Sequence, residues 1–398
     1  CYPARIGFDQ CMVLFPGQAE GLNPDEHTIA TQLKDAGYAT KIIGKWHCGD
    51  QPEFLPTEHG FDEYFGIPFS NDMGRQVGRE DAPPLPLVRD KTVIQEQPDQ
   101  RGITERYTDE ALQFIHANQD RPFFLYLPHM YVHVPLFVPN QFLDRSRNGA
   151  YGGAVEAIDW STGVLLDALE RLGLVENTLV IFTSDNGSRA RDEGGSNLPC
   201  RGTKATTFEG GQRVPCIMRW PGKIKAGRTC SAVTRSIDFF PTLSKLAGVE
   251  VPDDRKIDGV DISTLMLDES AEAPNDTFAY YWSNDLAAIR VGDWKLHFKI
   301  SGWVADDLEE RENVLYNLAE DVGETANVYE KHPDVVERLE ATADKIRAEL
   351  GDSLRGIEGT EKRPVGRVEN AKPLTEYRED HPYMIAMYDM ADSKVMAG

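Results

Sequence analysis

The chain has 398 residues, of which 42 are Lys or Arg and 65 are Asp or Glu, so its formal net charge at pH 7 is −23. Such an acidic chain argues against a nucleic-acid or anionic-membrane partner, because those surfaces are bound through clustered Lys and Arg. No run of about 18 apolar residues occurs, so no membrane span is expected. The length exceeds the roughly 250–300 residues at which single cores stop growing, so we expect two domains.

The six cysteines predict neither a zinc site nor a disulfide scaffold. No two of them form a C-x-x-C pair, and their spacing fits no zinc motif. Six in a chain of this length are too sparse to staple a fold, so no disulfide pairing is predicted. The cysteines are Cys1, Cys11, Cys48, Cys200, Cys216 and Cys230.

The first two thirds of the chain alternate helical patterns with short apolar strands. In each unit, apolar residues at helical spacing precede a run of strand length, and a glycine or a turn separates the two. This alternation predicts an α/β fold with one large sheet sandwiched between helices. The expected helix and strand pairs are 23–37 with 39–44, 108–118 with 123–127, and 155–172 with 178–183.

The pattern of expected elements changes near residue 270, from alternating helices and strands to consecutive short strands followed by a helix. Short strands are expected at 278–282, 287–291 and 294–300, and an amphipathic helix at 334–350. These elements predict a smaller α+β domain with an antiparallel sheet. The expected organisation is a catalytic α/β domain at 1–270, the α+β domain at 271–351 and an extended tail at 352–398.

Polar side chains follow each predicted strand of the first domain. Lys45 and His47 follow the first strand, His133 lies just beyond the second, and Asp185 and Asn186 follow the third. Ligands of such sheets bind beyond the carboxyl ends of the strands, so we expect these residues to form one composite site.

The residue types at this edge indicate a metal and an oxyanion. Asp185 and Asn186 offer the hard oxygen ligands that suit Ca²⁺ or Mg²⁺, although Asp-Asn-Gly is also a common turn sequence. Taken singly, Lys45 and His47 are better explained as solvated or packed side chains, whereas His133 is better placed for a site but could also be a packed residue. Lys204 follows a Gly-rich stretch, but the phosphate-loop pattern is absent. Together the residues describe a pocket for a tetrahedral oxyanion and a divalent metal, which indicates a hydrolase of sulfate or phosphate esters.

Several segments resemble the sulfatase family, particularly arylsulfatase A-like enzymes of the alkaline phosphatase superfamily. The resemblance covers roughly residues 1–350 and implies that family's fold, hydrolysis of sulfate esters, and a metal that is normally Ca²⁺, with Mg²⁺ as the alternative. The Gly-Lys-Trp-His sequence combined with the block at 204–211 is specific to the family. The matching segments are 37–47, 59–62, 66–72, 122–135, 184–187, 204–211, 288–295 and 315–318.

The resemblance also implies a role for each candidate residue. His47 is similar to the base that opens the covalent sulfate intermediate, and Lys204 or His133 would protonate or stabilise the leaving oxygen. The implied groups are the metal ligands Asp185 and Asn186, the substrate-binding residues Lys45, Ser70, His133 and Lys204, and the catalytic residues Lys45, His47, His133 and Lys204.

The nucleophile of the family is a formylglycine, which the formylglycine-generating enzyme makes from cysteine in a Cys-x-Pro-Ser/Ala-Arg motif. Residues 1–5, Cys-Tyr-Pro-Ala-Arg, fit that motif superficially, but the apolar pair and Thr-Gly that continue it do not follow. Residues 2–7 align better with a segment that follows the motif. We therefore expect the nucleophile, the first strand and two aspartate ligands to lie before residue 1, and the chain as given to be N-terminally truncated and inactive.

Other functions stay open at this stage. A phosphodiesterase or phosphonate monoester hydrolase of the same superfamily would share the fold and the charge of the site, and a non-catalytic binding homologue would keep the site without the nucleophile. The resemblance implies a periplasmic or secreted protein that acts on a small-molecule or carbohydrate sulfate ester. The loops at 71–75 and 189–197 are candidates for substrate selection, but they do not identify the ester.

Overall fold

The computed structural model describes residues 1–10, 13–191, 193–302 and 312–383. Its larger part is built on a mixed five-stranded sheet in the order β5-β4-β3-β2-β6. The strands β3 and β6 run parallel to β2, and β4 and β5 extend the sheet in antiparallel fashion. The five strands are β2 (Ala39–Ile43), β3 (Glu63–Gly66), β4 (Pro86–Arg89), β5 (Thr92–Glu96) and β6 (Phe123–Tyr126).

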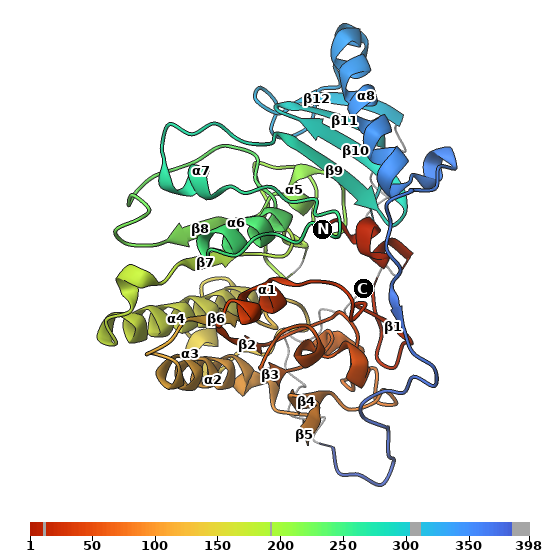
Figure 1. Cartoon of the computed structure of the whole chain (residues 1–398). Helices are drawn as coiled ribbons and strands as arrows, with labels where there is room; N and C mark the ends of the chain where they lie inside the picture. Colours follow the sequence, from red (N-terminus) through yellow and green to blue (C-terminus); the bar gives the residue numbers. More distant parts are fainter. Residues whose placement is uncertain (11–12, 192, 303–311, 384–398) are drawn as a thin grey trace.

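Helices cover this sheet, and the main core lies beneath them. Figure 1 shows α2 (Ile103–Ala117), α3 (Asn140–Leu143) and α4 (Gly149–Arg171) packed together beside β2 and β6. The core contains Ile43 and Phe65 from the strands and Tyr107 from α2, all almost fully buried. The predicted α/β class is confirmed. The remaining helices are α1 (Ile29–Asp35), α5 (Glu209–Gln212), α6 (Phe239–Leu246), α7 (Ser263–Leu267) and α8 (Pro333–Leu350).

The first helix begins later than the sequence pattern predicts. A start at residues 23–26 is wrong, because α1 begins at Ile29, where the Thr28 side chain accepts a hydrogen bond from the Thr31 N–H at 3.1 Å. The side chain of Asn23 accepts from the backbone N–H two residues later at 3.0 Å. A residue that can cap a helix equally stabilises such a turn, so the local pattern did not distinguish the two.

The third expected strand forms, but it pairs differently from the expectation. Among the described residues, β7 (Val180–Thr183) pairs only with the antiparallel β8 (Cys216–Arg219), and not with β6 or β2. Apolar side chains of this two-stranded sheet are exposed, by 37% at Phe182 and 63% at Ile217. The strand ends that lead into the candidate site therefore come from two separate hydrogen-bonded sheets.

The C-terminal part is a four-stranded antiparallel sheet in the order β12-β11-β10-β9, with α8 packed on β10 and β11. Ile289, Leu296 and Leu339 are fully buried between this sheet and α8. Three of the strands match the expected ones, and the fourth was not expected. The domain boundaries remain predictions. The strands are β9 (Thr277–Trp282), β10 (Asp285–Val291), β11 (Trp294–Lys299) and β12 (Glu312–Asn317).

The tail returns from the C-terminal sheet to the N-terminal part of the chain. Figure 1 shows it running along the side of the molecule, where β13 (Gly366–Arg367) pairs with β1 (Glu20–Gly21). None of the described helices is both long and apolar enough to cross a membrane. The described cysteines, Cys1, Cys48, Cys200, Cys216 and Cys230, are unpaired, and Cys11 lies outside the described residues.

Candidate functional site

The segment after β2 is held by the loops that follow the two neighbouring strands. The backbone N–H of Lys45 donates to the Pro128 carbonyl, and that of His47 donates to the Pro68 carbonyl, both at 2.9 Å. His47 adopts a left-handed conformation with φ of 61°, which turns the chain at this point. Its Nε2 lies 3.0 Å from the Leu14 carbonyl oxygen. Because a carbonyl only accepts, Nε2 carries the proton and Nδ1 is the basic nitrogen.

Ser70 and His133 are brought together from segments 63 residues apart. The Ser70 hydroxyl oxygen lies 3.2 Å from His133 Nδ1, and that nitrogen lies 2.6 Å from the Val134 carbonyl oxygen. Nδ1 therefore carries the proton, and Nε2 is left as the acceptor of the ring. The Ser70 side chain is 2% exposed, and its hydroxyl proton remains available for donation to an anion.

Lys204 lies on a loop, residues 201–211, that packs against the Asp-Asn-Gly segment after β7. The Lys204 N–H donates to the Ser188 carbonyl, and the Gly187 N–H donates to the Gly211 carbonyl, both at 3.0 Å. A Cβ atom at Gly187 would lie only 1.8 Å from the Gly210 carbonyl oxygen. The two segments can approach this closely only because glycine stands at their contact.

The charges of these residues act on one another. Burial and then the charge of Lys204 lower the pKa of Lys45 to about 8, and burial also lowers the pKa of Lys204. Burial lowers the pKa of His133 to about 4, helped by both lysines, and burial and Lys45 do the same for His47. At neutral pH the site therefore holds two neutral imidazoles beside lysines that carry positive charge.

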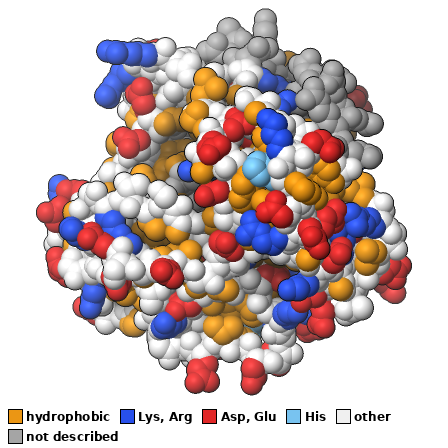
Figure 2. Space-filling model, turned by 90° about the horizontal axis from the view of Figure 1, so that it is seen from above, with side chains coloured by type: hydrophobic (Ala, Val, Ile, Leu, Met, Phe, Trp, Pro, Cys, Tyr) orange, Lys and Arg blue, Asp and Glu red, His pale blue; other side chains and the backbone are white. Residues whose placement is uncertain are grey.

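The structure thus places Ser70 against His133, and the charges of Lys45, His47, His133 and Lys204 act on one another, while the roles of these residues remain predictions. No described acidic side chain forms an ion pair with either lysine. On the face of the molecule shown in Figure 2, basic side chains are interspersed with acidic ones rather than gathered in a patch. In the candidate site, by contrast, Lys45 and Lys204 lie near each other, and this local positive charge favours binding of an anion.

Sequence reasoning missed an acidic residue of this site. The negative charge of Asp72 raises the pKa of Lys45, His47, His133 and Lys204, so it acts on all four groups. Its Oδ1 is buried and has no hydrogen-bond partner among the described residues. Its place at the end of the segment 66–72, two residues after Ser70, was an available signal, but we considered its loop only for substrate selection.

A second acidic group approaches Lys204 from the segment that follows Ser188. Glu193 acts on Lys204 together with Arg189, and Arg189 Nε lies 3.8 Å from Glu193 Oε1. The Glu193 side chain is buried, and its Oε2 has no hydrogen-bond partner among the described residues. Part of the predicted selection loop at 189–197 therefore does lie next to the candidate site.

Asp185 and Asn186 provide oxygen atoms at the end of β7. The negative charge of Asp185 raises the pKa of Lys45 and of Lys204. Carboxylate and amide oxygens fit a hard divalent cation, but Ca²⁺ takes about six to eight oxygens. The part of the chain that the structure describes contains no group of three or more His, Cys, Asp or Glu side chains that could hold a metal. The pair supplies only part of a metal site.

Cys1 is anchored by other residues. Arg363 donates to its Sγ at 3.5 Å, and the Lys256 carbonyl lies 3.7 Å from the same atom. Arg5, which would complete the superficial nucleophile motif, is buried and forms ion pairs with Asp258 at 2.6 Å and Glu349 at 3.0 Å. None of these contacts involves a candidate-site residue, which favours the alignment that rejects Cys1 as the nucleophile.

Comparison with family profiles and curated proteins gives consistent matches. A profile described as "Sulfatase" matches residues 5–249, and one described as "N-sulphoglucosamine sulphohydrolase, C-terminal" matches residues 203–349. The N-acetylgalactosamine-6-sulfatase of Mus musculus is 42% identical over 292 residues, which cover 70% of this chain and 55% of that protein. The chain spans between 55% and 63% of the length of the N-acetylgalactosamine-6-sulfatases it matches.

Two crystal structures share the architecture. The PsFucS1 sulfatase from Pseudoalteromonas sp. superposes with a TM-score of 0.77 at 26% identity, covering 87% of this chain and 78% of that one. Ps i-CgsB in complex with k-i-k-neocarrahexaose superposes with a TM-score of 0.73 at 27% identity, covering 86% of this chain and 79% of that one.

Proposed function

Because this chain belongs to the sulfatase family, we propose that it acts in the hydrolysis of sulfate esters. The observation that carries the proposal is the meeting of Lys45 and Lys204, which form no ion pair with any described side chain, with the hydrogen-bonded pair Ser70 and His133. A sulfate ester brings a tetrahedral anionic group with several acceptor oxygens. Two cations and a hydroxyl donor complement such a group in both charge and hydrogen bonding.

The geometry supports a division of labour among these residues. Lys45 and Lys204 hold the sulfate by charge, and the Ser70 hydroxyl donates a hydrogen bond to it. His47 acts as the base through Nδ1, because its Nε2 proton is directed at the Leu14 carbonyl. Lys204 or His133 protonates or stabilises the leaving oxygen. Burial lowers the pKa of Lys204, so this lysine releases a proton near neutral pH more readily than a free lysine would.

Membership of the family suggests a divalent metal ion. We propose Ca²⁺, with Mg²⁺ as the alternative, since Asp185 and Asn186 offer hard oxygen donors beside the two lysines. The ion would add positive charge where the sulfate binds. The proposal also includes a formylglycine nucleophile, made by a formylglycine-generating enzyme from a cysteine other than Cys1. The anchoring of Cys1 by Lys256 and Arg363 supports this choice.

We propose a sulfated carbohydrate as the ester, with an aryl sulfate as the alternative. The oligosaccharide in the similar Ps i-CgsB structure and the likeness to an N-acetylgalactosamine-6-sulfatase support the carbohydrate. A periplasmic or secreted location is proposed from the family resemblance.

Turnover measured on the protein produced from its natural gene, together with a formylglycine-generating enzyme, tests the function. We expect hydrolysis of 4-nitrophenyl sulfate to exceed that of phenyl phosphonate. Lys204→Ala should lower kcat/KM by about 10²–10³-fold, because it removes a cation that contacts the reacting group. Cys1→Ala should keep full activity, and so should Lys225→Ala, whose side chain is 71% exposed. Faster phosphonate hydrolysis, or activity abolished by Cys1→Ala, would contradict the proposal.

A further inference from the structure

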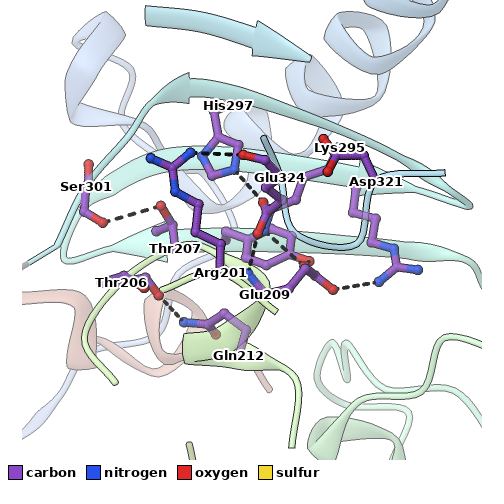
Figure 3. Close-up of polar contacts among 12 residues, drawn as sticks. Arg201, Thr206, Thr207, Glu209, Gln212, Lys295, His297, Ser301, Asp321 and Glu324 are labelled. Carbon is purple, nitrogen blue, oxygen red and sulfur yellow. Dashed lines mark hydrogen bonds and ion pairs between the residues drawn. The ribbon is translucent and has the colours of Figure 1, made fainter. Parts of the chain in front are cut away.

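A fully paired group of buried charges lies where the Lys204 loop meets the C-terminal sheet. We call Glu209, Lys295 and Glu324 the buried ion cluster. Lys295 Nζ lies 3.0 Å from Glu209 Oε1 and 2.9 Å from Glu324 Oε1. All three side chains are at most 2% exposed. Glu209 belongs to α5, Lys295 to β11 and Glu324 to the segment after β12, and Figure 3 shows the three residues among their polar neighbours.

Neighbouring groups complete the charge balance of the buried ion cluster. Arg290 donates to the second carboxylate oxygen of Glu209 at 3.0 Å, and the Tyr280 hydroxyl donates to its first at 2.6 Å. His297 Nε2 lies 3.2 Å from Glu324, and burial lowers the pKa of this ring to about 4, so the ring is neutral at pH 7. Two carboxylates thus face two cations, and a buried arrangement of this kind tolerates little displacement.

The same contact fixes the backbone of the Lys204 loop. The Glu209 N–H donates to Glu324 Oε2 at 2.7 Å, and Arg201, at the start of the loop, donates to the Glu324 carbonyl at 2.9 Å. Between them, the Thr207 N–H donates to the Ser301 carbonyl at 3.2 Å. Glu324 therefore binds both ends of the loop that carries Lys204.

Lys204 itself lies between two fixed surfaces. Its N–H is bonded to Ser188 on the side of the candidate site, and Thr206 forms a β-bridge with Gly302 on the side of the C-terminal sheet. Ala205 between them has a left-handed φ of 63°, which a residue other than glycine adopts only when its surroundings hold it there. The position of Lys204 thus depends on contacts from both parts of the chain.

We propose that Lys295 and Glu324 are positioning residues of the sulfate site, which fix the Lys204 ammonium through the loop 201–211. The C-terminal sheet then contributes to sulfate binding without touching the substrate. This inference rests on the proposed function, because it assumes that Lys204 contacts the sulfate. According to this proposal, the buried ion cluster increases the affinity for sulfate in addition to stabilising the fold.

A matched pair of glycine variants tests the inference without altering any charge. A Cβ at Gly302 would lie 2.8 Å from the Ala205 carbonyl oxygen, so Gly302→Ala must displace the Lys204 loop. A Cβ at Gly323 would meet its nearest neighbour at an ordinary 3.5 Å, which makes Gly323→Ala the control. Titration calorimetry with sodium sulfate, well below the unfolding temperature, should give a Kd about ten-fold higher for Gly302→Ala. The control should bind as the unaltered chain does.

The charged variant Glu324→Gln provides the second measurement, with amide hydrogen exchange as its readout. We expect faster exchange in residues 203–207 and a Kd for sulfate about ten-fold higher. A purely structural role would lower the unfolding temperature and leave the Kd of the folded protein unchanged, and that result would overturn the inference. Should the unaltered chain bind no sulfate, the proposed function fails, while exchange in residues 203–207 still decides whether Glu324 positions the loop.

Discussion

The lysine of the buried ion cluster and the two lysines of the candidate site have opposite surroundings. In the buried ion cluster, Lys295 is completely buried and contacts two carboxylates within 3.0 Å. In the candidate site, Lys45 and Lys204 lie near each other, and neither has an ion-pair partner among the described residues. A lysine whose charge is already balanced stabilises the fold, whereas a lysine whose charge is unbalanced is available for an anion.

One member of each group, Lys204 of the candidate site and Glu209 of the buried ion cluster, lies on the loop 201–211. Glu209 and Lys204 are five residues apart, so the charges that stabilise the loop and the charge that binds the ligand move together. Placing the ligand-binding lysine on a segment fixed by buried ion pairs compensates for the cost of holding it near another cation. Each prediction below tests one side of this comparison.

The largest effect is expected when a cation of the buried ion cluster is removed. Lys295→Met would leave the carboxylates of Glu209 and Glu324 buried without their shared partner, so the free energy of unfolding should fall by about 3–5 kcal/mol. Urea denaturation measures this change. Lys225→Met is the control, because its exposed ion pair with Glu269 should contribute less than about 1 kcal/mol. A loss for Lys295→Met no larger than that of the control would remove the distinction between the two groups.

Removing a lysine of the candidate site should raise the free energy of unfolding instead of lowering it. Lys45 has a pKa of about 8 in the folded chain, below its ordinary 10.5, so the unfolded chain binds that proton more tightly. The charge therefore destabilises the fold below pH 8, and this effect disappears as the pH rises to about 10.5. Lys45→Met should raise the free energy of unfolding by about 1–2 kcal/mol at pH 7 and by much less at pH 10, while sulfate binding falls.

Urea denaturation at both pH values, combined with titration of sodium sulfate, checks this prediction. Lys225→Met again serves as the control and should show no such dependence on pH. A variant at Lys45 that is less stable than the unaltered chain at pH 7 would mean that this lysine is paired like Lys295, and the comparison would fail on that side.

Local sequence patterns predicted much of the fold because the interactions involved are local. The helix α4 and the strands β10 and β11 follow from the apolar patterns at 155–172, 287–291 and 294–300. The start of α1 was wrong because Asn23 stabilises a turn as readily as a helix end. The pairing of β7 was also not predictable, since which strand lies beside it depends on the arrangement of the whole chain.

In the candidate site, too, some features could be predicted from local sequence patterns and others depend on the arrangement of the whole chain. The positions after β2 and β6 predicted that Lys45, His47 and His133 would meet, because parallel strands end at one edge of a sheet. The buried ion cluster carries no local signal, since its hydrogen bonds join Glu209 to residues 86 and 115 positions further along the chain. The role of an acidic residue such as Asp72 could not be predicted from the sequence, because it depends on which cations the fold brings near it.

The smallest predicted effect is a change in the pKa of a histidine when sulfate binds. It is expected for His133 in the candidate site and not for His297 beside the buried ion cluster. Burial lowers the pKa of both His133 and His297 to about 4. Sulfate bound beside His133 favours the imidazolium form, so its pKa should rise by about one unit, equivalent to about 1.4 kcal/mol. His297 is completely buried beside Glu324 and cannot contact an added anion, so its pKa should not change.

Long-range proton–nitrogen NMR correlations of the two rings, recorded between about pH 3.5 and 7.5, measure both pKa values in one sample. Sodium chloride at matched ionic strength is the control, because it screens charge without supplying a tetrahedral ligand. Equal shifts at His133 and His297 would indicate a general effect of salt. A shift confined to His133 would place the anion beside this ring, and its size would measure how strongly the unpaired lysines hold the anion there.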